Sequence, residues 1–376
     1  MQHSYWEIKQ YFNQVDYTVV GSGIVGINTA LRLRERFPKA KIIILEKGYL
    51  PAGASSKNAG FACFGSPSEL LSDLANNSEQ EVFDLVKLRK QGLNRLIKNC
   101  GSDLIDYQVN GSFEIFTKNE VELFNKCEHN LNYLNQLLYP IFNDHTFEKS
   151  DSSIDEFGFN HVSHLIKNKF EGQIDTGKMF TRLIHLAQQK NIQIINGIGV
   201  TGFEEFNSHS SVILDNGFSY KTKKLLIATN GFASKLLPEL DIEPARAQVL
   251  ITQPIQNLKI KGTFHLEEGY YYFRNIDNRI LLGGGRNLAF EEENTTKLCT
   301  TQLIQDKLEL LLSEIILPNQ KVEIEHRWAG VMGIGDIKTP IVKQLSNSVY
   351  CGIRMGGMGV AIGSLVGEQL GDLVSP

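Results

Sequence analysis

The sequence predicts an α/β fold with a second, α+β domain built on an antiparallel or mixed sheet. The first observation is a strand, a helix and a strand in succession: Tyr17–Val20 is β-branched, Ile24–Phe37 is apolar at helical spacing, and Lys41–Leu45 is a second strand-like run. The second is a series of short strands joined by turns, at residues 246–252, 262–266, 269–274 and 279–283. A length of 376 residues also favours two domains, because single cores rarely grow that large.

The first strand and helix are joined by Gly21, Gly23 and Gly26, which form GxGxxG. Gly21 allows the tight turn, Gly23 lets a pyrophosphate approach the backbone, and Gly26 lets the helix lie close to the strand. Glu46 ends the second strand, where its carboxylate can accept hydrogen bonds from both ribose hydroxyls, so FAD or NAD is favoured over NADP. Glycines also mark ordinary turns, but strand, helix, strand and terminal acid in register indicate a Rossmann-like dinucleotide site.

Composition narrows the function classes. Hydrophobic residues make up 42% and charged residues 21%, as in ordinary globular proteins, and a net charge of −4 gives no basic footprint for nucleic acid. The five cysteines are odd in number and lack CxxC, so neither a disulfide framework nor a metal site is predicted, and a reducing compartment is expected. We see no signal peptide and no apolar run of membrane-spanning length, which favours a cytoplasmic protein.

Residues 47–66, KGYLPAGASSKNAGFACFGS, form a long loop without helix or strand periodicity. Loops of this length inside compact domains are usually functional. Ser55, Ser56, Lys57 and Asn58 offer hydrogen-bond donors here, and the small Ala59 and Gly60 leave room for a ligand. A mobile surface loop is the alternative, which Phe61, Cys63 and Phe64 weaken because these side chains favour burial.

Short buried strands return after an inserted region, which implies a discontinuous cofactor domain. Residues 211–214 and 223–228 read as strands around a DNG turn at 215–217, and a helix is expected over 295–313. We therefore expect residues 1–82, 165–235 and 326–376 to form the FAD-binding domain and residues 83–164 and 236–325 to form the substrate domain.

Several separated motifs occur in a fixed order. They are GSGIVG at 21–26, Glu46, GASSKNAGF at 53–61, ATNG at 228–231, RAQ at 246–248, GYYYFR at 269–274, RWAG at 327–330 and GIRMGGMGVA at 352–361. Together they resemble the superfamily of FAD-dependent oxidoreductases that contains D-amino-acid oxidase, glycine oxidase and sarcosine oxidase, over nearly the whole chain. The resemblance implies a fold of the D-amino-acid oxidase type. It also implies noncovalent FAD, since no cysteine lies between Trp328 and Lys343, where some members attach the flavin.

The resemblance also assigns cofactor contacts. It implies that residues 55–61 wrap the pyrophosphate, that Val200 meets the adenine, that residues 229–231 turn over the ADP, and that residues 356–360 present N–H groups to the flavin. The alternatives are an ordinary strand for Val200, a strand-end turn for residues 229–231 and a surface salt bridge for Arg354. The predicted cofactor-binding residues are Gly21, Gly23, Ile24, Val25, Gly26, Glu46, Lys47, Ser55, Ser56, Lys57, Asn58, Ala59, Gly60, Phe61, Val200, Thr229, Asn230, Gly231, Gly352, Arg354, Gly356, Gly357, Met358, Gly359 and Val360.

Members of this superfamily transfer a hydride from a carbon next to an amine nitrogen to flavin N5. The resemblance places Tyr271 over the flavin, with Met332 and Met358 as further substrate-site candidates. Arg274 is a fourth candidate, although strand alternation puts it opposite Tyr271 unless the strand bulges. Plain sheet packing explains the three consecutive tyrosines equally well.

The chain departs from the superfamily pattern at two substrate-side positions. The arginine that clamps the substrate carboxylate in amino-acid oxidases falls on Met332, so a free α-amino acid is not expected. The lysine used for reaction with oxygen falls near Leu281, so rapid oxidase behaviour is not expected either. The segment GYYYFRNIDNRILLGGG resembles the γ-glutamylputrescine-oxidase-like branch more than it resembles glycine oxidase.

We therefore predict FAD-dependent oxidation of a C–N bond in a small amine or amino-acid derivative, with oxygen or another electron acceptor. Two alternatives remain open. One is an NAD-dependent dehydrogenase, and the other is a flavoprotein partner or modification subunit without free small-amine oxidase activity.

Overall fold

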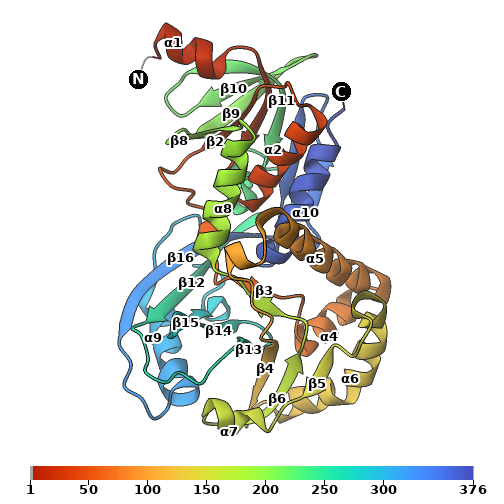
Figure 1. Ribbon diagram of the computed structural model, residues 1–376, viewed down its shortest axis with the longest axis vertical. Coiled ribbons are helices and arrows are strands. Elements are labelled where there is room, and N and C mark those ends of the chain that lie inside the picture. The colour runs from red at the N-terminus through yellow and green to blue at the C-terminus, as the bar shows by residue number, and fades with distance from the viewer. Residues whose placement is uncertain (1–2, 376) are drawn as a thin grey trace.

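The computed structural model describes residues 3–375 and has two lobes, each organised around one large sheet (Figure 1). The first sheet runs β17-β18-β11-β1-β2-β8, and β10 and β9 extend it from β11. Its strands are β1 Val15–Val20, β2 Ile42–Glu46, β8 Gln193–Asn196, β9 Val200–Glu205, β10 Ser210–Leu214, β11 Ser219–Ile227, β17 Ile341–Gln344 and β18 Val349–Ile353. β1, β2, β8, β11 and β18 are parallel, so their carboxyl ends share one edge of the sheet.

The predicted strand–helix–strand unit is confirmed. Helix α2, Ile24–Arg36, begins after the extended Gly23 and ends just before Pro38, which cannot continue a helix. Its inner face buries Ile27 and Leu33 completely, each contributing about 1.5–3 kcal/mol of hydrophobic stabilisation. Because β1 and β2 lie in register, the glycine turn and Glu46 emerge side by side at the carboxyl edge.

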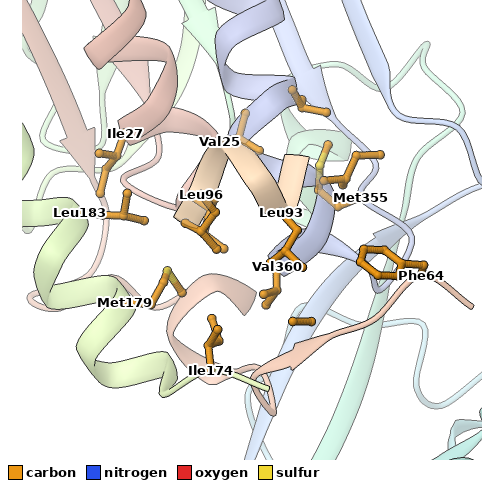
Figure 2. Packing of buried hydrophobic residues seen from close by; sticks show 14 of the residues in the cluster. Val25, Ile27, Phe64, Leu93, Leu96, Ile174, Met179, Leu183, Met355 and Val360 are labelled. Carbon is orange, nitrogen blue, oxygen red and sulfur yellow. The ribbon is translucent and has the colours of Figure 1, made fainter. Parts of the chain in front are cut away.

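Three helices from distant segments form one core with this sheet and α2. They are α5 Glu79–Cys100, α8 Thr176–Gln189 and α10 Gly359–Asp372. Figure 2 shows where they meet: Leu93 and Leu96 of α5 and Met179 and Leu183 of α8 surround the base of α2. The α10 helix lies directly on α2, since a Cβ on Gly367 would reach the carbonyl oxygen of Val25 at 2.5 Å.

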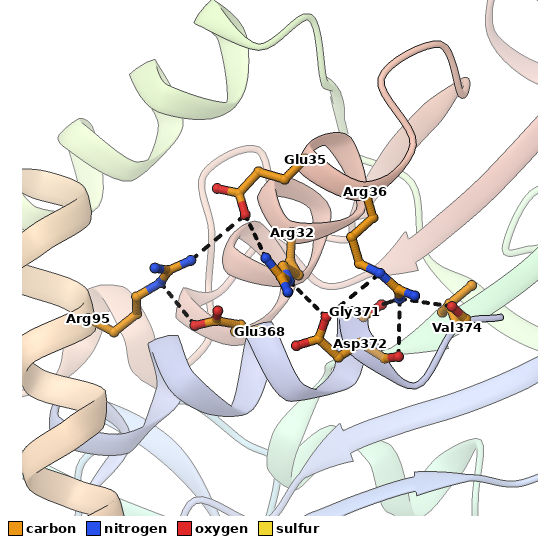
Figure 3. Close-up of polar contacts among 8 residues, drawn as sticks. All are labelled: Arg32, Glu35, Arg36, Arg95, Glu368, Gly371, Asp372 and Val374. Carbon is orange, nitrogen blue, oxygen red and sulfur yellow. Dashed lines mark hydrogen bonds and ion pairs between the residues drawn. The ribbon is translucent and has the colours of Figure 1, made fainter. Parts of the chain in front are cut away.

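Ion pairs on the outer surface join α2, α5 and α10 (Figure 3). Arg32 of α2 pairs with Asp372 of α10 at 2.8 Å, and Arg95 of α5 pairs with Glu368 of α10 at 3.0 Å. Arg36 also donates to the carbonyl oxygens of the last turn of α10, including that of Gly371 at 2.6 Å. Because these contacts are partly exposed to solvent, each adds little to stability.

The second sheet runs β16-β12-β15-β14-β13-β4-β6-β5, and only the β13–β4 pair is parallel. Its strands are β4 Ser112–Thr117, β5 Phe147–Lys149, β6 Val162–Asn168, β12 Glu243–Thr252, β13 Thr263–Leu266, β14 Tyr271–Ile276, β15 Arg279–Gly284 and β16 Ile324–Ile334. Stacked rings of Phe113, Phe264 and Phe273 form its core, which helix α9, Gln302–Leu311, also covers. The predicted α/β fold with a mixed second sheet is confirmed.

Several boundaries differ from the sequence prediction. The limits expected at 165 and 326 fall inside β6 and β16, because both strands pair within the second sheet along their length. The helix expected from Thr295 begins only at Gln302, since the backbone N–H of Thr301 is held by the side chain of Gln248 at 2.9 Å. The loop at 47–66 contains a short helix and a two-residue strand, α3 Ala54–Lys57 and β3 Phe61–Ala62; β3 pairs with β7, Gly172–Gln173.

The remaining elements are shorter or peripheral. They are α1 Tyr5–Glu7, the π-helices Ile8–Phe12 and Leu312–Ile316, α4 Pro67–Asn76, α6 Val121–Phe142, α7 Ser153–Phe157, and the 3₁₀ turns Asp103–Ile105, Asn230–Lys235 and Arg286–Leu288. Within residues 3–375, no helix is both long and apolar enough to span a membrane.

Candidate functional site

A cavity of about 820 Å³ lies between the two lobes. At one end it is lined by the glycine turn after β1, by the end of β2 and by the start of α2. At the other end it is lined by residues of β12, β13 and β14 in the second sheet. The loop at 47–66 and the first turn of α10 form its middle. The cavity therefore joins the predicted nucleotide site to the predicted substrate domain.

Backbone forms the nucleotide end. Gly21 has φ +99°, a conformation that favours glycine, and Gly23 leaves the entrance to α2 open. A Cβ on Gly23 would lie 2.8 Å from Ser55 Oγ, the atom that accepts a hydrogen bond from the Ile24 N–H at 2.9 Å. A helix N-terminus with a small-residue approach suits a pyrophosphate group.

Glu46 lines the cavity at the end of β2 and is nearly buried. Its Oε2 accepts hydrogen bonds from the Ser22 N–H at 3.1 Å and the Ser22 hydroxyl at 2.8 Å, and its Oε1 accepts one from the Gly48 N–H at 3.0 Å. These bonds hold the carboxylate in place, and its two oxygens keep further lone pairs for ribose hydroxyls.

Side chains from both lobes hold the middle of the cavity. Trp328 of β16 donates its indole N–H to the carbonyl oxygen of Lys57 at 2.9 Å, which ties the loop to the second sheet. Asn230 accepts hydrogen bonds from the N–H groups of Arg354 and Met355, both at 3.1 Å, and so fixes the segment that leads into α10. The N-terminal end of α10 then faces the cavity, where its dipole favours negative charge on a bound group.

Side chains form the substrate end. The lining residues there include Phe61, Cys63, Ala247, Val249, His265, Tyr270, Tyr272, Arg286, Thr296, Leu298 and Met332. Burial raises the pKa of Tyr272 to about 12, so its phenol remains a hydrogen-bond donor at neutral pH. The guanidinium of Arg286 lies over Phe290 and forms no hydrogen bond or ion pair with any residue from 3 to 375. Burial lowers the pKa of Arg286.

Most of the predicted cofactor-binding residues line the cavity. They are Gly21, Gly23, Ile24, Val25, Glu46, Lys47, Ser55, Lys57, Asn58, Ala59, Phe61, Val200, Thr229, Asn230, Gly356, Gly357, Met358, Gly359 and Val360. The hydroxyl oxygen of Thr229 is buried there without a hydrogen-bond partner in the described chain. A polar atom in that position, the open approach at Gly23 and the carboxylate of Glu46 all fit a bound dinucleotide.

Six predicted cofactor residues do not line the cavity and act in packing. Cβ atoms on Gly26 and Gly231 would collide with the carbonyl oxygens of Gly21 and Met332, and one on Gly352 would lie 2.9 Å from the Leu370 side chain.

The other three are Ser56, Gly60 and Arg354. The Ser56 hydroxyl donates to the Pro51 carbonyl at 2.5 Å, and Gly60 turns the chain with φ +75°. Arg354 is buried, forms an ion pair with the exposed Asp241 and donates to the carbonyl oxygen of Thr339 at 3.0 Å, which agrees with the salt-bridge alternative.

Tyr271, which was predicted to lie over the flavin, does not line the cavity. Tyr271 is fully buried in the core of the second sheet, and its neighbours Tyr270 and Tyr272 line the cavity instead. Alternation along β14 puts Tyr272 and Arg274 on the same face. Arg274 is only 2% exposed and lies under the loop near Gly60, outside the cavity lining, and burial lowers its pKa to about 10. Met332 and Met358 line the cavity as predicted.

The residues that sequence reasoning missed are mostly on the substrate side. Tyr272 is one of the three consecutive tyrosines of the GYYYFR motif. A six-residue strand that is buried on both faces does not reveal from its sequence which set of alternate residues faces a ligand. His265 and Arg286 lie in short segments without a motif, and only the sheet brings them to the cavity.

Comparison with known proteins agrees with this geometry. The model of a family described as FAD dependent oxidoreductase matches residues 16–373. A probable oxidoreductase OrdL of Haemophilus influenzae is 20% identical over 96% of this chain and 82% of its own length, and L-2-hydroxyglutarate dehydrogenase of Escherichia coli K12 is 23% identical over 87% and 75%. The solved structure of glycine oxidase from Bacillus cereus superposes with a TM-score of 0.76 at 17% identity, covering 96% of each chain.

Proposed function

The chain belongs to the FAD-dependent oxidoreductase family, and from this premise we propose that it oxidises a C–N bond of a small amine or amino-acid derivative. The observation that carries the proposal is the continuity of the cavity from the glycine turn to the second sheet. When bound, FAD supplies the acceptor for a hydride from the carbon next to the nitrogen. The family match favours FAD over the NAD alternative.

The walls of the substrate end suit a neutral amine. Phe61, Val249, Leu298 and Met332 exclude water, and amine oxidation needs an uncharged nitrogen and a positioned carbon more than it needs a protein base. The phenol of Tyr272 is the nearby donor that can orient a polar substrate atom. Oxygen or another acceptor would then take the electrons.

The charged groups bear on the substrate class. The Met332 side chain cannot form an ion pair with a substrate carboxylate, whereas Arg286 places an unpaired guanidinium at another part of the cavity lining. An acidic group distant from the reacting carbon, or an N-substituted amino acid, fits this arrangement better than a free α-amino acid.

Oxidation of a C–O bond in a 2-hydroxy acid is the second candidate, because one of the curated relatives is L-2-hydroxyglutarate dehydrogenase. The two candidates differ in the atom next to the reacting carbon, so one substrate panel separates them.

The test is anaerobic reduction of the purified, FAD-loaded protein, followed by the loss of flavin absorbance. The panel holds primary amines, N-methyl amino acids, D-amino acids, γ-glutamyl amines and 2-hydroxy acids. Bleaching by a compound with a C–N bond supports the proposal, and bleaching by hydroxy acids alone replaces it with the second candidate. If dithionite bleaches the protein but no panel compound does, the enzyme proposal gives way to a flavoprotein partner subunit. Admission of air after bleaching separates oxidase from dehydrogenase.

A further inference from the structure

Three buried side chains with metal-ligating atoms meet beside the cavity. They are Cys63, which follows β3, Glu171, which precedes β7, and His265 in β13. One ligand atom from each lies within 4.8 Å of the other two. The side chains are 2%, 0% and 6% exposed, and Cys63 and His265 line the cavity. Their wide separation in the sequence explains why no metal-ligand spacing is visible there.

The polar atoms of this cluster lack the partners that burial requires. Neither His265 Nε2 nor Glu171 Oε2 has a well-aligned hydrogen-bond partner among residues 3–375, although the Ser112 side chain lies close to the Glu171 carboxyl. The other oxygen of Glu171 accepts from the N–H groups of Phe64 at 2.5 Å and Gly65 at 3.0 Å, which fixes the carboxylate. Cys63 Sγ lies 3.6 Å from Thr263 Oγ1 and 3.9 Å from the Gly172 carbonyl oxygen, and it also interacts with the Glu171 carboxyl. Each unpartnered buried polar atom destabilises the folded protein unless an ion or water satisfies it.

The charges around the cluster leave room for a cation. With a metal ion bound, the Cys63 thiolate and the Glu171 carboxylate would supply two negative charges, which a divalent ion balances. Arg89 acts electrostatically on Glu171 and Arg274 acts on Cys63, but neither arginine forms an ion pair with Glu171 within residues 3–375. Arg89 instead donates to the Phe64 carbonyl at 2.6 Å. Burial raises the pKa of the Cys63 thiol and of the Glu171 carboxyl, so protons compete with a metal ion at this place.

We propose that Cys63, Glu171 and His265 bind one divalent metal ion of the zinc class, with its fourth coordination position open to the cavity. Sulfur, imidazole nitrogen and carboxylate oxygen form a donor set that suits zinc. Three protein ligands and an open position are the arrangement of catalytic rather than structural zinc sites. One ion would satisfy His265 Nε2, Glu171 Oε2 and the thiolate together. The proposal does not depend on which substrate the flavin oxidises, since metal content is measured without turnover.

The first test is the metal content of the FAD-loaded protein by mass spectrometry, before and after incubation with zinc sulfate and gel filtration. We expect one zinc ion per chain in the wild type. Cys63→Ser and His265→Asn should each weaken zinc binding by at least about tenfold, as loss of metal-site partners does. Cys299→Ser and His129→Asn are the matched controls, because both residues are exposed and lie outside the cluster, and they should keep the ion.

X-ray absorption at the zinc edge is the second test, and it needs only the wild type. One sulfur at about 2.3 Å with nitrogen and oxygen at about 2.0–2.2 Å supports the site. A shell without sulfur overturns it, as does wild-type protein that holds no zinc after incubation. Equal loss of zinc from the control variants overturns it too, because the ion would then be bound elsewhere. Retained flavin in each variant verifies that it has folded.

Discussion

The two ends of the cavity are built from different materials. The nucleotide end consists of glycines, backbone N–H groups and Glu46, supplied mainly by the continuous segment from β1 to α3. The substrate end consists of side chains such as Tyr272, His265 and Arg286, which β12, β13, β14 and the chain after β15 supply. A backbone site needs a fixed local sequence, whereas a side-chain wall needs only the correct sheet register. The first is therefore visible as a motif and the second is not.

The two ends are also held differently. Exposed ion pairs join α2, α5 and α10 behind the nucleotide end (Figure 3). Behind the substrate end, Arg246 and Glu293 form a buried bidentate pair, with N···O distances of 2.7 and 2.6 Å, and Gln248 also donates to Glu293. This pair anchors the segment that carries Thr296 and Leu298 of the cavity wall. Breaking a buried pair costs far more than breaking an exposed one.

The largest effect is expected from Gly23→Val. A branched side chain would occupy the pyrophosphate approach and collide with Ser55 Oγ, so the purified protein should contain no flavin and should not regain it from added FAD. Flavin absorbance after desalting is the measurement. Gly202→Val is the control, because its Cβ would meet only the Ile213 side chain, at 3.9 Å, and a fully yellow Gly23→Val protein would refute the assignment.

Glu293→Gln should lower the free energy of unfolding by about 3–5 kcal/mol, because it leaves the Arg246 charge buried without its partner. Urea unfolding of the FAD-loaded protein measures this loss. The matched control is Glu325→Gln, which breaks the more exposed pair with Arg279 and should leave the free energy of unfolding almost unchanged. Equal losses in the two variants would contradict the difference between buried and exposed pairs.

Glu46→Ala should weaken FAD binding by about tenfold to a hundredfold. It removes charge-assisted acceptors, each contributing about 1.5–3 kcal/mol, at the carboxyl edge of β2. Titration of flavin-free protein with FAD, followed by fluorescence, gives the affinity. Glu35→Ala removes a carboxylate from the exposed network and should leave FAD affinity unchanged, so unaltered affinity in Glu46→Ala would exclude its ribose role.

The smallest effect separates two adjacent tyrosines. Tyr272→Phe removes a hydroxyl at the cavity and should lower kcat/KM by up to about tenfold, the value of one hydrogen bond. Tyr271→Phe removes a buried hydroxyl from a residue that does not line the cavity and should leave kcat/KM unchanged. Steady-state kinetics with the substrate found by anaerobic reduction decides between them, and the opposite pattern would restore Tyr271 to the site.

The sequence by itself determined the dinucleotide half of this protein. GxGxxG, the following helix and Glu46 lie within one short stretch, where turn geometry, helix packing and hydrogen bonding to ribose each require a particular residue. The same local requirement made residues 55–61 and 356–360 recognisable, and most of them line the cavity.

Only the tertiary structure decided the substrate half. It showed that Tyr272 rather than Tyr271 lines the cavity, that β16 belongs to the second sheet, and that Cys63, Glu171 and His265 meet. The physical reason is that these outcomes depend on pairing between strands far apart in the chain. A one-residue change of register reverses every side chain of a strand, and nothing in the local sequence of a strand buried on both faces fixes that choice.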